Sequence, residues 1–259
     1  MNSRLSTPGT SLTAVASGKG GVGKTFLTAN LASCFVSAGK KVLVVDCDLG
    51  LANMDILLGV APGLTLQDVI FDGRDIRDVI VATGAGFDLL PASSGVKEMG
   101  QLMYEKLQTI KATLNTIIPE YDEILLDTGA GISEVVLQFN LFAPKNVIVL
   151  NKEPTSMTDA YAVIKVMHQR FQTKSFGIVI NSVRDENEAH RLFAHMDGVC
   201  KNFLSLPLHY LGHIIRDDTV PQSVVNQRVL VQDAPECPVG LNCRSIAQAV
   251  GDWLNPKVV

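Results

Sequence analysis

The sequence lacks any apolar run long enough to cross a bilayer, and it has no internal repeat or low-complexity tract. Its longest apolar runs, such as residues 146–150 between Lys145 and Lys152, have the length of a strand, whereas a transmembrane helix needs about 20 residues. No Pro/Ser-rich linker or charge run divides the 259 residues. This length suits one large α/β domain or two small ones. The missing break favours a flexible segment over residues 1–10 and a single domain over residues 11–259.

Positive charge is also scarce, because the formal net charge is -4 at pH 7. From Lys201 onward, five basic residues are balanced by five acidic ones. Nucleic-acid binding needs a basic face, so we do not expect strong binding to nucleic acid. The helix expected over residues 244–254 carries a single basic residue, Arg244. Because a membrane-surface helix is rich in Lys and Arg, we expect this helix to pack on the protein, with weak or no membrane binding.

The five cysteines form no obvious disulfide framework, since their number is odd and no signal-peptide pattern precedes the first expected strand. We therefore expect reduced thiols and a cytoplasmic protein. Cys34 and Cys47 suit the role of small buried apolar residues. Cys237 and Cys243 have five residues between them in a Pro-containing stretch that we expect to be a loop. Zinc-binding pairs usually have two to four, so two unrelated thiols are favoured over a metal pair.

Against these absences stands one strong motif, Gly-Lys-Gly-Gly-Val-Gly-Lys-Thr over residues 18–25. It fits G-x-x-x-x-G-K-[ST], the phosphate-binding loop of nucleoside triphosphatases. The glycines let successive backbone N–H groups point at phosphate oxygens. The lysine would reach the β- and γ-phosphates, and the Thr hydroxyl would bind Mg²⁺. The residues predicted to bind the nucleotide phosphates here are Gly18, Gly20, Gly21, Val22, Gly23, Lys24 and Thr25.

The surroundings of this motif support it. Residues 12–17 form a short apolar run typical of a buried strand, and residues 25–38 have apolar positions near helical spacing. A strand, a glycine-rich loop and a helix in this order place the phosphates at the helix N-terminus, which favours an anion. A chance glycine-rich turn is much less compatible with this context.

The rest of the chain alternates between apolar runs of strand length and helical patterns. The expected strands cover residues 12–17, 41–46, 87–90, 123–127, 146–150, 176–181 and 210–214. The expected helices cover residues 25–38, 66–71, 98–117, 133–142, 156–171, 186–203 and 244–254. Such alternation predicts a doubly wound α/β fold, with a mostly parallel sheet and helices on both faces. Ligands in these folds bind beyond the carboxyl ends of the strands.

Acidic residues stand at two of those strand ends. Asp46 and Asp48 follow the second apolar run, and Asp127 ends the run over residues 123–127. An apolar strand that ends in Asp is the Walker B pattern, whose carboxylate holds Mg²⁺ directly or through water. Carboxylates also suit Mg²⁺ because this ion binds oxygen ligands and keeps several waters. Each Asp alone could instead be a helix cap, and the phosphate loop favours the metal role.

The lysine at position 19, just after the first glycine, adds a second feature to the loop. The pattern K-G-G-x-G-K-[ST] resembles the deviant phosphate loop of the MinD/ParA family of dimerising ATPases. Residues 46–55, 127–132 (DTGAGI) and 153–161 resemble the flagellar branch of that family, called FlhG or FleN, which regulates flagellar number and placement. The resemblance extends from the first strand to the last helix.

The resemblance implies an ATPase that uses ATP or ADP with Mg²⁺ and dimerises with ATP. In the family, the lysine equivalent to Lys19 reaches across the dimer to the partner's nucleotide. Lys24 would be the second catalytic cation, and Asp48 would position the attacking water. Asp46 and Asp127 would support Mg²⁺ together with the threonine of the loop.

Three further roles are implied by the same resemblance. Glu153 would lie at the dimer interface near the nucleotide, and Asp159 could hold Lys19 in the resting monomer. Asn181 matches the residue that hydrogen-bonds the adenine, although an Asn at a strand end is also an ordinary turn residue. The pair Asn151-Lys152 replaces the turn expected before Glu153, and the sequence does not explain its effect.

The resemblance also implies a protein partner: a flagellar GTPase, a component of flagellar assembly or a transcription regulator. Localisation at a pole or at the membrane would then depend on that partner. The N-terminal helix with which many flagellar members stimulate their GTPase has no counterpart in residues 1–10. Two other ATPase types, ParA-type partitioning and MinD-type positioning, remain alternatives. A metal-cluster carrier of the Mrp type is disfavoured by the spacing of the two C-terminal cysteines.

Overall fold

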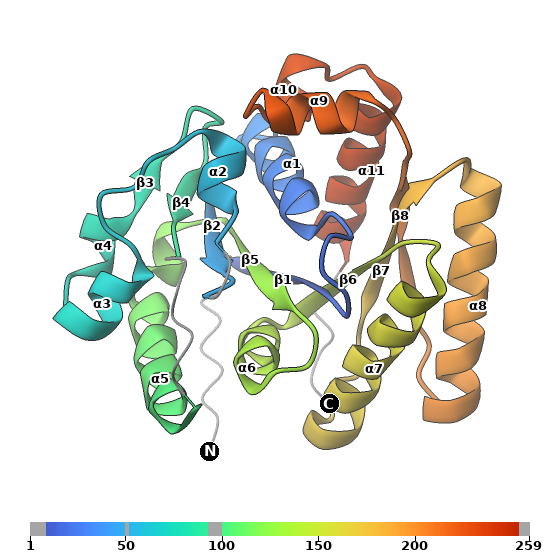
Figure 1. The fold of residues 1–259 in the computed structure, drawn as a ribbon, viewed down its shortest axis with the longest axis horizontal. Helices are drawn as coiled ribbons and strands as arrows, with labels where there is room; N and C mark the ends of the chain where they lie inside the picture. The colour runs from blue at the N-terminus through green and yellow to red at the C-terminus, as the bar shows by residue number, and fades with distance from the viewer. Residues whose placement is uncertain (1–8, 50–51, 93–99, 254–259) are drawn as a thin grey trace.

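The computed structural model describes residues 9–49, 52–92 and 100–253, with the backbone alone for residues 100–105 (Figure 1). Most of the predicted flexible segment, residues 1–10, lies outside these ranges. Within them, the Thr10 hydroxyl donates hydrogen bonds to the carbonyl oxygens of Ile118, at 3.2 Å, and Tyr121, at 2.9 Å. The chain is therefore tied to the rest of the fold immediately before the first strand.

A single eight-stranded sheet in the order β3-β4-β2-β5-β1-β6-β7-β8 forms the centre of the described structure. Every pairing is parallel except that of β3 with β4. The strands are β1 Ser11–Ser17, β2 Val42–Cys47, β3 Val81–Ala82, β4 Asp88–Leu90, β5 Glu123–Ala130, β6 Lys145–Leu150, β7 Gly177–Val183 and β8 His209–Ile215. The predicted doubly wound α/β architecture is thus confirmed.

Helices cover both faces of this sheet (Figure 1). One face packs against α1 (Lys24–Ser37), α2 (Met54–Leu58), α10 (Leu230–Asp233) and α11 (Pro238–Asp252). The opposite face packs against α3 (Leu66–Asp72), α4 (Ile76–Val79), α5 (Gly100–Ile117), α6 (Glu134–Phe142), α7 (Pro154–Phe171) and α8 (Glu186–Leu204). The remaining helical segments are η1 (Ile118–Glu120) and α9 (Thr219–Val225). Burial on both faces explains why the central strands read as unbroken apolar runs.

The predicted strands are all present, within two or three residues at their ends. Residues 98 and 99 of the predicted helix 98–117 lie outside the described ranges. The sequence patterns did not reveal β3, α2, α4, α9 or α10. These elements span two to seven residues, too few for a hydrophobic period to repeat.

The last helix differs from its prediction. It begins at Pro238 rather than at position 244, so the expected loop around Cys237 and Cys243 is wrong. Proline is favoured at the first position of a helix because its missing N–H would have no partner there. The Cys237 sulfur accepts a hydrogen bond from the Gly240 N–H at 3.2 Å and so caps the helix. The apolar face of α11 is buried on the sheet, as the lack of basic charge predicted, and Leu254 lies outside the described residues.

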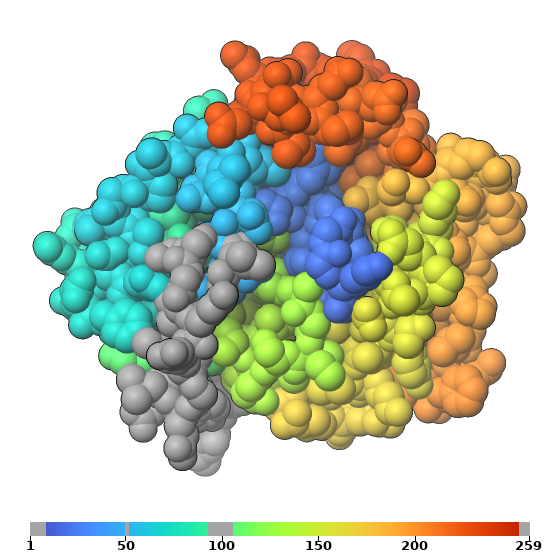
Figure 2. All heavy atoms as spheres, viewed as in Figure 1, coloured from blue at the N-terminus to red at the C-terminus, as the bar shows by residue number. Residues whose placement is uncertain are grey.

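The sheet brings the carboxyl ends of its parallel strands to one edge, and the strand register aligns specific residues there. Asp46 of β2 is the direct neighbour of Asp127 of β5, which in turn is the neighbour of Val15 of β1. The phosphate loop therefore begins next to both carboxylates. In Figure 2 this loop lies at the surface, bordered by the regions of α2, α6 and α7, with α9 and α10 above it.

A buried amide on α1 offers a test of this packing. The Asn30 side chain accepts a hydrogen bond from the Val231 N–H at 3.0 Å and donates one to the Phe26 carbonyl at 2.8 Å. Asn30→Ala would leave the buried Val231 N–H without its partner, at a cost of about 1–3 kcal/mol. Urea unfolding measures this loss. Ser37→Ala, which removes an exposed side chain on the same helix, should change stability by less than about 0.5 kcal/mol.

Candidate nucleotide-binding site

The loop after β1 is shaped by glycines at its end. Gly21 and Gly23 both have left-handed backbones, with φ of 75° and 95°, and Gly23 is the N-cap residue of α1. A side chain at Gly23 would also place its Cβ 2.2 Å from Asn181 Nδ2. Glycine is therefore required there for both conformation and space. The first turn of α1 contains no acidic residue, which leaves its unpaired N–H groups suited to an anion.

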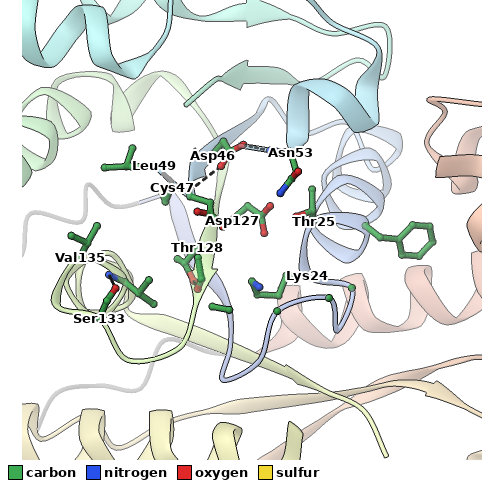
Figure 3. A pocket seen from close by; sticks show the side chains of 18 residues that line it. Lys24, Thr25, Asp46, Cys47, Leu49, Asn53, Asp127, Thr128, Ser133 and Val135 are labelled. Carbon is green, nitrogen blue, oxygen red and sulfur yellow. Dashed lines mark hydrogen bonds between the residues drawn. The ribbon is translucent and has the colours of Figure 1, made fainter. Parts of the chain in front are cut away.

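Lys24, the first residue of α1, is buried with 8% of its surface exposed. Burial lowers the pKa of its ammonium group, and the nearby carboxylates of Asp127 and Asp48 partly offset this effect. The Lys24 side chain lines a cleft together with the side chains of Asp127 and Asp48. Figure 3 shows Lys24 and Asp127 in this cleft. A desolvated ammonium in that position is suited to bind the negative charge of a phosphate.

Asp46 and Asp127 are the two most buried carboxylates of the cleft, with 2% and 3% of their surfaces exposed. The pKa values of both are raised, chiefly because burial disfavours the charged form; Asp127 adds to the rise at Asp46 through its negative charge. The hydroxyls of Thr25 and Thr28 hydrogen-bond Asp127, the latter at 3.3 Å. Two adjacent desolvated carboxylates thus line a cleft with a single buried cation, Lys24, whose charge acts on Asp127.

This donor set fits Mg²⁺. The predicted metal residues, Thr25, Asp46 and Asp127, all line the cleft and supply hydroxyl and carboxylate oxygens (Figure 3). A divalent cation would provide the positive charge that the two buried carboxylates lack. Among the described residues no three His, Cys, Asp or Glu side chains form a closed metal cluster. Mg²⁺ in nucleotide sites needs none, since it binds one or two carboxylates, waters and phosphate oxygens.

Asp46 also organises the segment that follows β2. Its two carboxylate oxygens accept hydrogen bonds from the N–H groups of Asp48, at 3.0 Å, Asn53, at 3.2 Å, and Met54, at 3.3 Å. Residues 50 and 51 of this segment lie outside the described ranges. The Asp48 side chain lies near Gly129, whose added Cβ would be 3.6 Å from the Asp48 carboxyl carbon. Asp48, the first residue after β2, therefore lies against the carboxyl end of β5.

The cleft has a volume of about 670 Å³. It combines the phosphate loop, the β2 end and the β5–α6 loop, and its lining residues are Gly20, Gly21, Gly23, Lys24, Thr25, Phe26, Asp46, Cys47, Asp48, Leu49, Asn53, Asp127, Thr128, Gly129, Ala130, Ser133, Val135 and Val136. Asn53 and Ser133 were not predicted as site residues. Asn53 lies within the segment 46–55 and Ser133 directly follows the segment 127–132, but neither an Asn nor a Ser indicates a nucleotide site by its residue type alone.

Asn181 is not among the residues that line this cleft, and its predicted contact with adenine stays a prediction. Its side-chain NH₂ donates to the Val22 carbonyl at 2.7 Å, and its side-chain oxygen accepts from the Ser182 N–H at 2.8 Å. In this structure Asn181 therefore supports the back of the phosphate loop. The close packing of its amide against Gly23 is part of the same contact.

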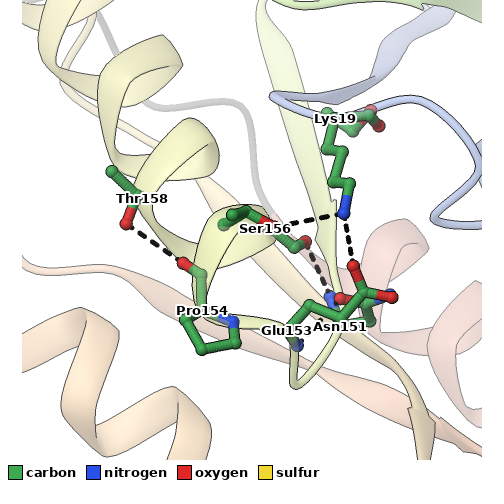
Figure 4. A network of polar contacts seen from close by, with 8 residues as sticks. Lys19, Asn151, Glu153, Pro154, Ser156 and Thr158 are labelled. Atoms are coloured by element: carbon green, nitrogen blue, oxygen red, sulfur yellow. Dashed lines mark hydrogen bonds and ion pairs between the residues drawn. The ribbon is translucent and has the colours of Figure 1, made fainter.

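Lys19 lies beside the cleft rather than within it. Its ammonium group forms an ion pair with Glu153 and donates a hydrogen bond to the Thr155 hydroxyl at 3.1 Å (Figure 4). Glu153 precedes α7 and lies at the carboxyl end of β6. The lysine of one motif and the glutamate of another are thus brought together within one chain.

Asp159 does not hold Lys19 in this structure, so that expectation is corrected by the pairing with Glu153. The backbone of Asp159 instead packs against the loop: a Cβ on Gly18 would lie 2.1 Å from the Asp159 carbonyl carbon. Glycine at position 18 therefore lets the start of the phosphate loop touch the main chain of α7.

The cysteines give no support to a metal-cluster site. All five are free thiols, and Cys243 is buried inside α11 while Cys237 caps it. Burial raises the pKa of the Cys34 thiol to about 11 and that of Cys243 still further. Raised pKa values disfavour the thiolate form that binds metals.

No helix in the described ranges combines the length and apolar character that a membrane crossing requires.

Comparison with known proteins agrees with this geometry. The family model described as the CobQ/CobB/MinD/ParA nucleotide binding domain matches residues 13–231. Antiactivator FleN of Pseudomonas aeruginosa is 37% identical over 94% of this chain and 87% of its own. Flagellum site-determining protein YlxH of Helicobacter pylori is 32% identical over 93% of this chain and 81% of its own.

Solved structures show the same likeness. MinD of Pyrococcus horikoshii in complex with Mg-ADP has a TM-score of 0.76 and 26% identity, and the match covers 94% of this chain and 96% of that one. A MinC:MinD complex from Aquifex aeolicus has a TM-score of 0.78 and 25% identity, with 93% and 95% covered.

Fold and site together define a P-loop ATPase of the MinD type, with ATP or ADP and Mg²⁺ as its ligands. The chain belongs to the CobQ/CobB/MinD/ParA nucleotide-binding family, and the FleN and YlxH matches confirm its resemblance to the flagellar branch. ATPases of this family dimerise and bind protein partners, as the MinC:MinD complex illustrates.

The shape of the loop can be tested at Gly23. Gly23→Ala would combine a strained left-handed backbone with overlap on Asn181, so we expect nucleotide affinity to fall at least about tenfold. Fluorescence titration with a labelled ADP measures this change. Gly198→Ala, in the middle of α8 with nothing within 4 Å of the added Cβ, should keep the affinity and raise stability by about 0.5–1 kcal/mol. Equal affinities for the two variants would contradict our account of the loop.

Proposed function

We propose that this chain is a nucleotide-operated switch of the flagellar type, which regulates flagellar number, flagellar placement or flagellar gene expression. Two copies associate when both hold ATP and Mg²⁺, and hydrolysis to ADP and phosphate separates them. Residues 11–259 act as one ATPase unit in this proposal. The similarity to FleN and YlxH over more than nine-tenths of the chain supports the flagellar assignment.

The observation that carries this proposal is the position of Lys19. It belongs to the phosphate loop by sequence, yet its ammonium group pairs with Glu153 beside the cleft. The side chains that do line the cleft include a single buried cation, Lys24. Phosphoryl transfer needs positive charge around the transferred group. A lysine at the rim is well placed to supply that charge to a second copy, in the manner of the family.

The remaining roles follow from the arrangement in the cleft. Lys24 and the loop glycines bind the phosphates, and Thr25, Asp46 and Asp127 would hold Mg²⁺. When bound, Mg²⁺ would neutralise charge on the β- and γ-phosphate oxygens. Asp48, which follows β2 and lies against the end of β5, accepts a hydrogen bond from the attacking water and orients it. Because the chain supplies positioning and charge rather than a covalent group, slow turnover suits its use as a switch.

Two residues at the edge of the site have roles outside the cleft. Glu153 would contact the nucleotide region of the second copy across the dimer interface. Asn181 would support the phosphate loop through Val22, and its second amide hydrogen and the second lone pair of its side-chain oxygen would serve a contact with adenine.

The partner is a protein of the flagellar system: a GTPase, an assembly component or a transcription regulator. Its identity would decide whether the ATPase sits at a pole or at the membrane. A ParA-type role in partitioning DNA is less well supported, since the net charge is -4 and DNA binding depends on neutralising phosphates. MinD-type positioning through the membrane is less well supported because the apolar face of α11 is buried on the sheet.

The two loop lysines should separate binding from hydrolysis. Lys24→Ala removes the buried cation of the cleft and should weaken nucleotide binding. Lys19→Ala should leave ATP affinity within about twofold but reduce hydrolysis on the order of 10³-fold, as for other cations supplied in trans. Titration with labelled ATP and a phosphate-release assay measure the two effects. Equal loss of affinity in both variants would remove the role of Lys19 in trans.

Dimerisation should depend on ATP and survive without hydrolysis. Asp48→Ala removes the acceptor for the attacking water but leaves Lys24 and the loop intact, so the variant should bind ATP and remain dimeric. Light scattering at tens of micromolar protein should give a dimer with ATP and Mg²⁺ and a monomer with ADP. A monomer in saturating ATP would contradict the proposed switch.

A further inference from the structure

A compact group of polar contacts surrounds Glu153 at the start of α7 (Figure 4). The Asn151 side-chain oxygen accepts a hydrogen bond from the Glu153 N–H at 3.0 Å, which closes a tight Asx turn. The Asn151 NH₂ donates to Oε1 of the same glutamate at 3.4 Å. The Asn151 N–H in turn donates to the hydroxyl of buried Ser156 at 3.1 Å. Asn151 therefore fixes both the backbone and the carboxylate of Glu153.

The other carboxylate oxygen of Glu153 pairs with Lys19, and Thr155 supplies a second acceptor for the same ammonium group. The pKa of Glu153 is lowered, first through the hydrogen bond and charge of Lys19 and also by the donation from Asn151. Both charged side chains are partly exposed, Lys19 at 38% and Glu153 at 52%. An exposed ion pair contributes little stabilising free energy when its side chains are free to move. The positioning of Glu153 before the pair forms therefore decides how well Lys19 is held.

From this geometry we propose that Asn151 is a positioning residue that keeps Lys19 within its own chain, and that this retention sets the protein concentration at which the ATP dimer forms. The inference rests on the proposed function, in which Lys19 acts on the nucleotide of a second copy. The ammonium group cannot contact Glu153 and Thr155 of its own chain and reach across the interface at the same time. Every contact that holds the Lys19 ammonium group within its own chain therefore opposes dimerisation.

The pair Asn151-Lys152, which the sequence left unexplained, gains a physical role here. Asn is suited to this position because one side chain supplies an acceptor for the Glu153 N–H and a donor for the Glu153 carboxylate. Thr155, the second residue of α7, completes the arrangement. Thr158, three residues further along α7, donates its hydroxyl to the Pro154 carbonyl at 3.0 Å rather than contacting Lys19, so it provides a matched control.

Trace acetylation of the full-length, nucleotide-free protein at low concentration tests retention directly, because an amine that is held in an ion pair reacts slowly. The labelling of Lys19 is compared by mass spectrometry with that of exposed Lys165 in the same sample. Asn151→Ala and Thr155→Val should each raise relative Lys19 labelling, by up to about fivefold for a pair of this exposure. Thr158→Ala should leave it unchanged. Unchanged labelling in the first two variants would overturn the inference, and Thr155→Val preserves the turn if Asn151→Ala perturbs it.

Dimerisation tests the consequence. In the Asp48→Ala background with ATP and Mg²⁺, Asn151→Ala should lower the dimer dissociation constant by about the square of the factor by which it raises labelling, because each dimer requires the release of two copies of Lys19. The affinity of the monomer for ATP should stay the same, which a purely structural defect in the turn would not give. A weaker or unchanged dimer would overturn the link to dimerisation. If the Asp48→Ala parent itself stays monomeric with ATP, the proposed function fails, whereas the labelling result still decides whether Asn151 retains Lys19.

Discussion

Two carboxylates that have lost most of their water lie side by side at the carboxyl edge of the sheet, where the cleft holds a single buried cation, and the site is arranged around this imbalance. The β2–β5 register places Asp46 beside Asp127, and α1 brings Lys24 near Asp127. Burial raises the pKa of each carboxyl group, so ionising both groups is unfavourable while no cation is bound. A cation relieves that cost, and the phosphates then need further positive charge of their own. The fold provides it in the loop and at the rim, where Lys19 stands.

The same imbalance connects chemistry to shape. Asp46 accepts three backbone N–H groups from residues 48–54, so the carboxylate that faces the cleft also fixes the beginning of α2. Asp48, which lies against the carboxyl end of β5, is held at its N–H by this contact. A change in the charge near the buried Asp46 carboxylate can therefore alter the placement of α2. This provides a short route from nucleotide state to a surface that a partner could sense.

The sequence predicted the parts of the site that depend on local chemistry. The glycine loop, Lys24 and Thr25 follow from a motif with fixed spacing, and Asp46 and Asp127 follow from strands that end in a carboxylate. It did not predict contacts that depend on how separate segments pack. Asn181 supports the loop from behind, and Lys19 meets Glu153 rather than Asp159, because those pairings are set by the angle of α7 and β7 against the loop. The start of α11 differs from the prediction for a local reason, since a proline suggests a loop, whereas Pro238 begins a helix.

At Gly18 the phosphate loop and α7 touch through their main chains, with no side chain between them. A contact between side chains can absorb a small shift by changing rotamers, whereas two backbones in van der Waals contact have no such freedom. An inward shift of the first turns of α7 would therefore be passed directly to the main chain of the loop. A protein that grips the outer surface of α7 would in this way move the phosphate loop itself, and could tune turnover without entering the cleft.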